Sequence, residues 1–194
     1  MSDYITTYSK IHFTPLEPKM EEISIADIAH ALSLMTRANG HFPEFYSVGQ
    51  HCLHCAAEAE AEGLPPRVKL ACLLHDAGEA YVADITRPVK KNLPSYREIE
   101  SRLLQSIYIR FLGTELTKEE AAEVRRIDDT LLYYEFLHYM GEALLPEKPE
   151  IVSHPVFETR AFKEVEREYL EVFQRLTEKL WKSPWYREAL RERI

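Results

Sequence analysis

Apolar residues recur every three or four positions along most of the chain, which is the pattern of amphipathic helices. In the first such segment Ile25, Ile28, Leu32 and Met35 fall on one face. The same periodicity predicts helices at residues 25–35, 47–63, 68–81, 95–112, 118–138 and 162–180. No stretch of useful length alternates apolar and polar residues as a half-buried strand does.

Residues that start and stop helices stand at the ends of these segments. Ser24 and Ser47 are placed as N-caps, and Pro65-Pro66 suits a first helical turn. Thr117-Lys-Glu-Glu120 is a capping box, and Gly113 ends the helix before it. These signals favour an all-α fold, a compact bundle of about six to eight helices.

The length of 194 residues suits a single domain with its own core. The core is expected between about residues 25 and 140. Residues 1–24, which contain Pro15 and Pro18, are expected to form an extended N-terminal arm. Residues 141–194 form a C-terminal helical extension, with a proline-bearing loop at 146–155 and a short helix in the tail at 181–194.

Charge and composition narrow the class of partner. The net charge is −8 and the isoelectric point about 5.5, which argues against binding to a nucleic acid polymer or to an anionic membrane surface. No apolar run is long enough to span a membrane, and the N-terminus lacks the apolar core of a signal peptide. Three cysteines, an odd number, indicate reduced thiols and a cytoplasmic location.

Four polar side chains stand at the end of the apolar third helix. His75 and Asp76 follow the apolar run directly, Glu79 lies one helical turn beyond His75, and Asp84 comes where the pattern breaks. Polar groups at the end of a buried segment are costly unless they are paired or bind a metal. The alternative is a helix end at which His75 and Asp76 only cap and hydrogen-bond.

Two further polar residues lie on apolar helix faces. His51 shares a face with Val48 and Cys55 in the second helix. Asp128 follows Val124 by four residues and precedes Leu131 by three, so its side chain should point into the bundle. A buried aspartate needs a partner, either a cation or an arginine such as Arg125 or Arg126.

These residues come from three different helices. Bundles build metal sites from inward side chains on facing helices, and imidazole and carboxylate groups suit a divalent ion with open positions. His51, His75, Asp76 and Asp128 therefore predict a site for one divalent metal ion, for example Mn, Co, Mg, Zn, Fe or Ni.

The cysteines offer another metal site. His51, Cys52, His54 and Cys55 overlap as His-x-x-His and Cys-x-x-Cys, as in some structural zinc sites. No second pair of ligands follows at zinc-finger spacing. Cys52 and Cys55 are therefore expected to be small buried hydrophobic residues.

The order His…His-Asp…Asp resembles the HD-domain metal-dependent phosphohydrolases. Within that superfamily the chain is most similar to the bacterial HD-domain 5'-deoxynucleotidases and the related phage dNTP hydrolases. The similar segments, together covering roughly residues 25–140, are Ser47-Val-Gly-Gln-His51, His75-Asp-Ala-Gly-Glu79, Asp84-Ile-Thr-Arg-Pro-Val-Lys90 and Val124-Arg-Arg-Ile-Asp128. Gln50 departs from the pattern, because relatives often carry an acidic residue there.

The resemblance implies roles for individual residues. It makes His51, His75, Asp76 and Asp128 the metal ligands, and it makes Glu79 the group that orients or deprotonates the attacking water. Asp84 would protonate or position the leaving oxygen. Arg37 becomes a candidate phosphate contact.

Two more substrate contacts are candidates from their positions. Lys90 could hold non-bridging oxygens, as Arg37 could, although both cations could equally be solvated surface charges. Tyr46, with Phe42 and Phe45, lies just before His51 and could stack on a base, although such aromatic residues are usually core.

The expected activity is hydrolysis of a phosphate ester in a (deoxy)nucleoside 5'-monophosphate by a metal-activated water. The alternatives are a dNTP triphosphohydrolase and a non-catalytic nucleotide-binding regulatory module. A diiron oxygenase would need more ligands, and no histidine between Asp76 and Asp128 could hold a second metal. Related proteins, and the long apolar stripes of residues 95–113 and 162–180, suggest a homodimer.

Overall fold

The structure is a computed structural model, and it describes residues 3–182 of the chain. Within that range the fold is all-α, with eight α-helices, two short 3-10 helices and one two-stranded hairpin. The helices are α1 (Ile25–Leu34), α2 (Val48–Ala61), α3 (Pro66–Leu74), α4 (Glu79–Val82), α5 (Arg87–Lys90), α6 (Pro94–Leu112), α7 (Lys118–Met140) and α8 (Phe162–Lys182). The number and order of the long helices confirm the sequence prediction.

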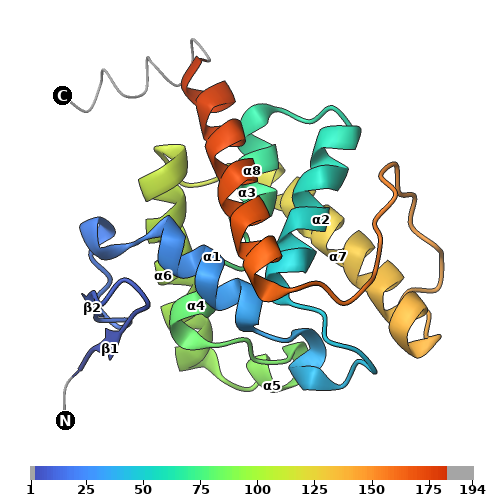
Figure 1. The fold of residues 1–194 in the computed structure, drawn as a ribbon, viewed down its shortest axis with the longest axis horizontal. Coiled ribbons are helices and arrows are strands. Elements are labelled where there is room, and N and C mark those ends of the chain that lie inside the picture. Colours follow the sequence, from blue (N-terminus) through green and yellow to red (C-terminus); the bar gives the residue numbers. More distant parts are fainter. Residues whose placement is uncertain (1–2, 183–194) are drawn as a thin grey trace.

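The helices α2 and α3 form the centre of the bundle. They pack against each other, α7 contacts both, and α8 lies across α1, α2 and α3 (Figure 1). Helix α3 is apolar on nearly every side, with Leu70, Leu73 and Leu74 fully buried. A helix that is apolar all round belongs in an interior, so α3 carries the residues that follow it into the middle of the molecule.

Capping side chains begin three of the helices where the sequence predicted them. The hydroxyl of Ser24 accepts a hydrogen bond from the backbone N–H of Asp27. Ser47 and Gln50 form a reciprocal capping box at the start of α2, and Thr117 and Glu120 form another at the start of α7. These contacts satisfy backbone donors that have no partner inside the helix.

The third predicted helix, residues 68–81, is wrong in one respect, because it is broken in two. Helix α3 ends at Leu74, and a tight turn at residues 75–78 leads into the single turn α4. The amides of Ala77 and Glu79 bond to the carbonyls three residues earlier rather than four. This tightening changes the direction of the chain, so His75 and Glu79 do not lie on one straight helix.

The N-terminal arm is also more ordered than predicted. Strands β1 (Ile5–Thr6) and β2 (His12–Phe13) pair in an antiparallel hairpin, and the 3-10 helix η1 (Met20–Glu22) follows. Phe13 is fully buried and its ring stacks on Tyr81 of α4. The turn of the hairpin is fastened to α1 as well, because the Tyr8 ring stacks on His30 and the amide of Ser9 donates to the carboxylate of Asp27.

The apolar stripes that suggested a homodimer are used inside the molecule. Leu103 and Ile107 of α6 and Val165 and Tyr169 of α8 are buried in the core. The homodimer therefore stays a prediction that rests on the resemblance alone. Helix α8 extends to Lys182, while the short helix predicted in the tail at 181–194 lies almost entirely outside the described residues. Within residues 3–182 no helix is long and apolar enough to cross a membrane.

Candidate metal centre

The four side chains predicted as metal ligands lie together. The Nε2 atom of His51, from α2, is 3.2 Å from Nε2 of His75 and 3.1 Å from Oδ1 of Asp128 on α7. Asp76 places Oδ2 3.3 Å from Nε2 of His75 and 3.8 Å from Nε2 of His51. The turn after α3 thus supplies two ligands, and α2 and α7 supply one each.

Both imidazoles direct the lone pair of Nε2 toward the space between the four side chains. The Nδ1 atom of His75 lies 2.8 Å from the carbonyl oxygen of Cys72, to which it can only donate, so its Nε2 is the unprotonated nitrogen of the neutral ring. The Nδ1 atom of His51 lies 2.6 Å from a carboxylate oxygen of Glu135, which gives that ring the same tautomer. Histidine ligands of metals are oriented in this way by acceptors behind them.

The electrostatics of the site favour a bound cation. Two Nε2 lone pairs that face each other at 3.2 Å, beside two carboxylates, repel unless a proton or a metal ion lies between them. Burial opposes the charged imidazoles, but Asp76 and Asp128 outweigh it and raise the pKa of His75 well above its usual value. Burial likewise opposes the carboxylate of Asp128, yet His51 and His75 hold its pKa far below normal. The donor set therefore fits a divalent metal ion.

Glu135 is a functional residue that the sequence interpretation missed. It is fully buried on α7, two helical turns after Asp128. One carboxylate oxygen accepts from His51 and, at 3.1 Å, from the hydroxyl of Tyr46, while the other bonds the Arg37 guanidinium at 3.2 Å. Its spacing of seven residues from Asp128 in an otherwise apolar stripe was the signal available in the sequence.

Arg37 is not the solvated surface cation that was one alternative. It lies in the 3-10 turn η2 (Arg37–Gly40), and its side chain is only 11% exposed. Its guanidinium bridges Asp76, at 3.5 Å, and Glu135. Burial opposes its charge, but Glu135 and Asp76 hold the pKa of Arg37 well above normal. Arg37 therefore supports a metal ligand from behind.

The alternative partners for Asp128 were wrong. Arg126 bonds Glu62 and Glu123 instead, and Arg125 lines the same cavity as Asp128 but forms no ion pair with it. Asp128 is bound by Arg87 of α5, whose guanidinium contacts Oδ2 of Asp128 at 2.7 Å and Oδ1 of Asp129 at 2.6 Å. Because Arg87 takes Oδ2, the other oxygen of Asp128 is left to face the two imidazoles.

The cysteines are buried and reduced, as expected, but two of them border the site. Cys55 has its sulfur 3.6 Å from Nε2 of His51. His51, Cys55 and His75 could hold an ion together, as could Cys52, His75 and Asp76. Burial raises the pKa of the Cys52 thiol, and thiols bind metals as thiolates, so the carboxylates are the better ligands.

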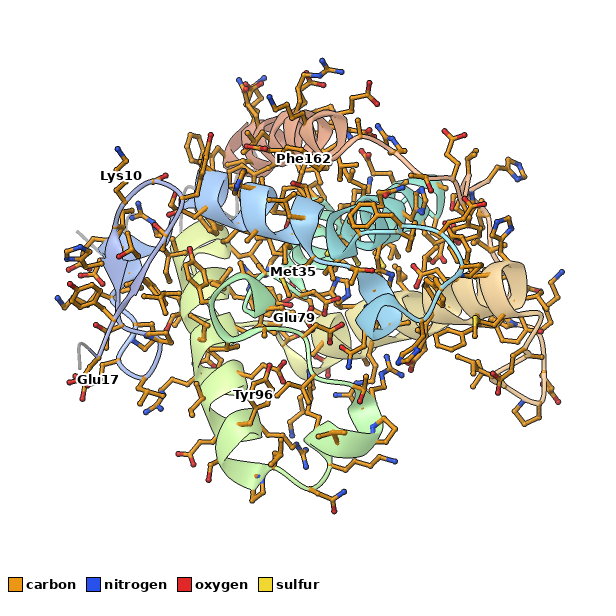
Figure 2. All side chains as sticks on the ribbon, turned by 60° about the horizontal axis from the view of Figure 1, so that its bottom comes forward. Lys10, Glu17, Met35, Glu79, Tyr96 and Phe162 are labelled. Atoms are coloured by element: carbon orange, nitrogen blue, oxygen red, sulfur yellow. The ribbon has the colours of Figure 1, made fainter. Side chains whose placement is uncertain are left out.

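In the view of Figure 2, Glu79 appears between Met35, the residue that follows α1, and Tyr96 of α6. It is 5% exposed, and its Oε2 has no hydrogen-bond partner among the described residues. Burial and the neighbouring Asp76 and Asp84 raise the pKa of Glu79 well above normal. Lys90, 3.9 Å from Oε1, bonds Glu100 at 2.6 Å, so it is not a free surface charge either.

A cavity of about 520 Å³ opens beside the cluster. His75, Asp76, Glu79, Lys90 and Asp128 belong to its wall, and most of the remaining lining residues come from α6, α7 and the loop between them. Ligand pockets commonly hold roughly 300–1,000 Å³, so a small molecule fits here next to an ion. Arg37 and Asp84 are not part of the cavity wall.

Tyr46 cannot stack on a ligand as predicted. Its ring is fully buried, and its hydroxyl lies 2.8 Å from Nδ1 of His54 and contacts Glu135. The preceding loop is tied to it, since the amide of Arg37 donates to the carbonyl of Tyr46. Phe42 is buried beside Tyr139, whereas Phe45 is 36% exposed. Tyr46 is therefore part of the support behind His51.

Gln50, the departure from the family pattern, does not face the cluster. Its side chain closes the capping box with Ser47 and donates to the carbonyl of Glu158 in the segment before α8. Its amide thus fastens the C-terminal extension to α2.

Comparison with known proteins finds partial similarity. No protein-family model matches the sequence. The chain is 38% identical to the uncharacterized protein YfdR of Escherichia coli K12 over 100 residues, which are 52% of this chain and 53% of that protein. It is also 38% identical to an uncharacterized protein of Rhodobacter capsulatus over 102 residues, 50% of this chain and 52% of the relative. The chain thus matches about half the length of each of these curated relatives.

Proposed function

We propose that the protein is an HD-superfamily metal-dependent phosphohydrolase that cleaves the phosphate ester of a (deoxy)nucleoside 5'-monophosphate. The supporting observation is the pair of Nε2 atoms of His51 and His75, whose lone pairs face each other and two carboxylates at 3.1–3.8 Å. His51, His75, Asp76 and Asp128 would hold one divalent ion. The cavity beside them provides the space for a substrate.

When bound, a divalent cation supplies Lewis acidity, which lowers the pKa of a water and polarises a phosphoryl oxygen. Glu79 would take the proton of the attacking water as the P–O5' bond breaks. Its Oε2 lies on the cavity wall, buried without a hydrogen-bond partner among residues 3–182, and burial raises its pKa, which makes the carboxylate a stronger base than a solvated one. Asp84 raises that pKa but is not part of the cavity wall, so it would act through Glu79, which could pass the proton on to the leaving oxygen.

Charge around the cavity favours a single phosphate. The wall carries the four carboxylates of Asp76, Glu79, Glu115 and Asp128 against the one guanidinium of Arg125, while the Lys90–Glu100 pair is neutral as a unit. One divalent ion can offset the charge of one phosphate group. Every further phosphate would bring repulsion from these carboxylates.

The test is a screen for released phosphate and pyrophosphate over NMPs, dNMPs and dNTPs in Mn²⁺, Co²⁺ and Mg²⁺. We expect inorganic phosphate from monophosphates. Triphosphate released from dNTPs would favour the triphosphohydrolase. Stoichiometric binding of nucleotides without turnover would favour a regulatory module and contradict the proposal.

A further inference from the structure

The cavity extends well beyond the residues that would hold the ion. Its outer wall comes from α6, through Ser101, Leu104 and Gln105, and from α7, through Ala121 and Arg125. These residues do not contact the ligand cluster and have no part in the chemistry proposed above. The outer half of the cavity is therefore a second feature that needs an occupant.

Polar groups in this outer half lack partners inside the protein. Gln105 and Arg125 are exposed, and within the described range 3–182 no hydrogen bond or ion pair involves their side chains. The other candidate cations differ from Arg125, because Arg37 bonds two carboxylates and Lys90 bonds Glu100. The donors available to a ligand thus lie on α6 and α7.

The remaining wall is apolar. Leu104, Leu116 and Val124 line it, and Tyr108 is buried among them. These apolar side chains could pack on the face of a flat aromatic ring of a ligand. The polar edge of that ring could then contact the side-chain amide of Gln105 and the guanidinium of Arg125. Gln and Arg are the side chains that most often make paired hydrogen bonds to the edges of adenine and guanine, respectively.

We propose that the part of the cavity between α6 and α7 is a nucleoside subsite, in which Gln105 and Arg125 contact the edge of the base. This assignment rests on the proposed function, because it places the leaving group of the phosphate ester. Arg125 precedes Asp128 by about one helical turn and lines the same cavity, so a nucleoside held by Arg125 would lie beside the ion ligands.

The carboxylate of Glu115 supports a base rather than a second phosphate. It lies on the cavity wall and is exposed, where it can accept a hydrogen bond from an exocyclic amino group. The same carboxylate would repel an anionic leaving group. With the Arg125 guanidinium on the same outer wall, the two charges offset each other, which suits a neutral ring with hydrogen-bonding edges, such as a nucleobase.

The experiment compares the metal-loaded full-length protein with three variants. Ala121→Phe would fill the outer cavity, and Ala122→Phe, on the exposed neighbouring position of α7 outside the cavity wall, is its matched control. Gln105→Ala is a milder change if Ala121→Phe lowers the yield of folded protein. Turnover is measured on nucleoside monophosphates and on ethyl phosphate, an ester without a ring, and binding of nucleosides without phosphate is measured by calorimetry.

For Ala121→Phe we expect nucleoside binding to disappear and the ratio of kcat/KM for nucleotides to that for ethyl phosphate to fall at least tenfold. Gln105→Ala should weaken nucleoside binding and change the ranking of the bases, and Ala122→Phe should behave as the unchanged protein. Unchanged binding and ratios in Ala121→Phe would overturn the subsite while leaving the phosphohydrolase intact. If no ester is turned over, the proposed function fails. The subsite is then still tested by calorimetry. It is overturned if the unchanged protein binds no nucleoside, or if Ala121→Phe binds nucleosides as well as the unchanged protein does.

Discussion

At the scale of single residues, the carboxylate of Glu135 holds the site together without facing the cavity. It meets His51, Arg37 and Tyr46, and Tyr46 in turn meets His54. In one consistent arrangement His54 donates to the tyrosine oxygen, and the tyrosine hydroxyl donates to Glu135. Both oxygens of the buried carboxylate are then satisfied, which such a group requires.

Glu79 should be costly for stability and necessary for turnover. Among the described residues its buried Oε2 has no hydrogen-bond partner, so Glu79→Gln, which keeps the shape but cannot ionise, should leave the melting temperature unchanged or raise it. If Glu79 is the general base, turnover should fall by about 10²–10⁴-fold while metal content is retained. Both quantities are measured on the one purified variant, with nucleotide affinity as a control.

A structural role for Glu79 as a helix cap gives the opposite pattern. A lost cap would cost on the order of 1 kcal/mol and spare the activity. The side chain makes no capping hydrogen bond in α4, so this outcome is not expected. Near-normal turnover with a lowered melting temperature would remove Glu79 from the mechanism.

His54 should make the protein less stable in acid. Burial lowers the pKa of His54 to about 4, so the folded state disfavours the protonated ring, whereas the unfolded chain binds the proton near pH 6.5. Its contribution is complete above pH 6.5 and is lost as the pH falls toward 4, on the order of 3 kcal/mol in all. Urea unfolding at pH 7, 5.5 and 4.5 measures this loss.

His54→Gln isolates the imidazole from the other groups that titrate in the same range. Gln can still donate a hydrogen bond toward Tyr46, but it does not titrate. The variant should therefore lose less stability than the unchanged protein between pH 7 and pH 4.5. Parallel pH profiles for the two proteins would show that His54 is not the source of the effect.

At the scale of elements, close contact between helices depends on Gly49. A Cβ atom at this position would lie 3.2 Å from the backbone of Leu32 in α1 and 3.1 Å from Val165 in α8. The backbone of α1 cannot yield as a flexible side chain would. We expect Gly49→Ala to lower the free energy of unfolding by about 1–3 kcal/mol, measured by urea titration.

Gly78 provides the matched comparison. It has a helical φ of −61°, and a Cβ there would come no nearer than 3.8 Å to Leu103. Gly78→Ala should therefore be neutral or stabilise by up to about 1 kcal/mol, because alanine restricts the unfolded chain. Equal losses in the two variants would contradict the packing argument.

Elements that depend on local signals were predictable from the sequence, and contacts between distant elements were not. Ser47 and Thr117 mark helix starts because a cap is a contact over three residues. The break after Leu74 was missed because apolar spacing continues through it. Arg87 and Glu135 were missed because an arginine beside a proline and a glutamate in a long helix usually face solvent, and only the folded chain brings them to Asp128 and His51.

The same division applies to the site. His51, His75, Asp76 and Asp128 could be selected because each is a polar residue on an apolar face, and the structure brings all four together. Arg37 was chosen as a substrate contact from the resemblance, and Tyr46 from its place just before His51 in the sequence. Both are satisfied inside the protein, by Asp76, Glu135 and His54, and a partner of that kind cannot be inferred from neighbouring residues.

At the scale of the whole molecule, the four predicted metal ligands come from three parts of the chain that are far apart in sequence. The ligands come from α2, from the turn after α3 and from α7, and Arg87 adds α5. The unfolded chain cannot hold an ion with this set of ligands, so metal binding should stabilise the entire fold. The expected gain is about 2.7 kcal/mol when the free metal exceeds its Kd by 100-fold.

This linkage gives a test of the ligand set that needs no substrate. Mn²⁺ or Co²⁺ should raise the melting temperature of the metal-stripped protein by several degrees, since about 1 kcal/mol shifts a domain of this size by roughly 2–4 °C. His75→Ala and Asp128→Asn should abolish the rise and the bound metal, while Cys55→Ala should keep both. If Cys55→Ala loses the rise in melting temperature and Asp128→Asn keeps it, the ion is held by the alternative ligand set of His51, Cys55 and His75. A rise that survives His75→Ala would place the ion outside this cluster altogether.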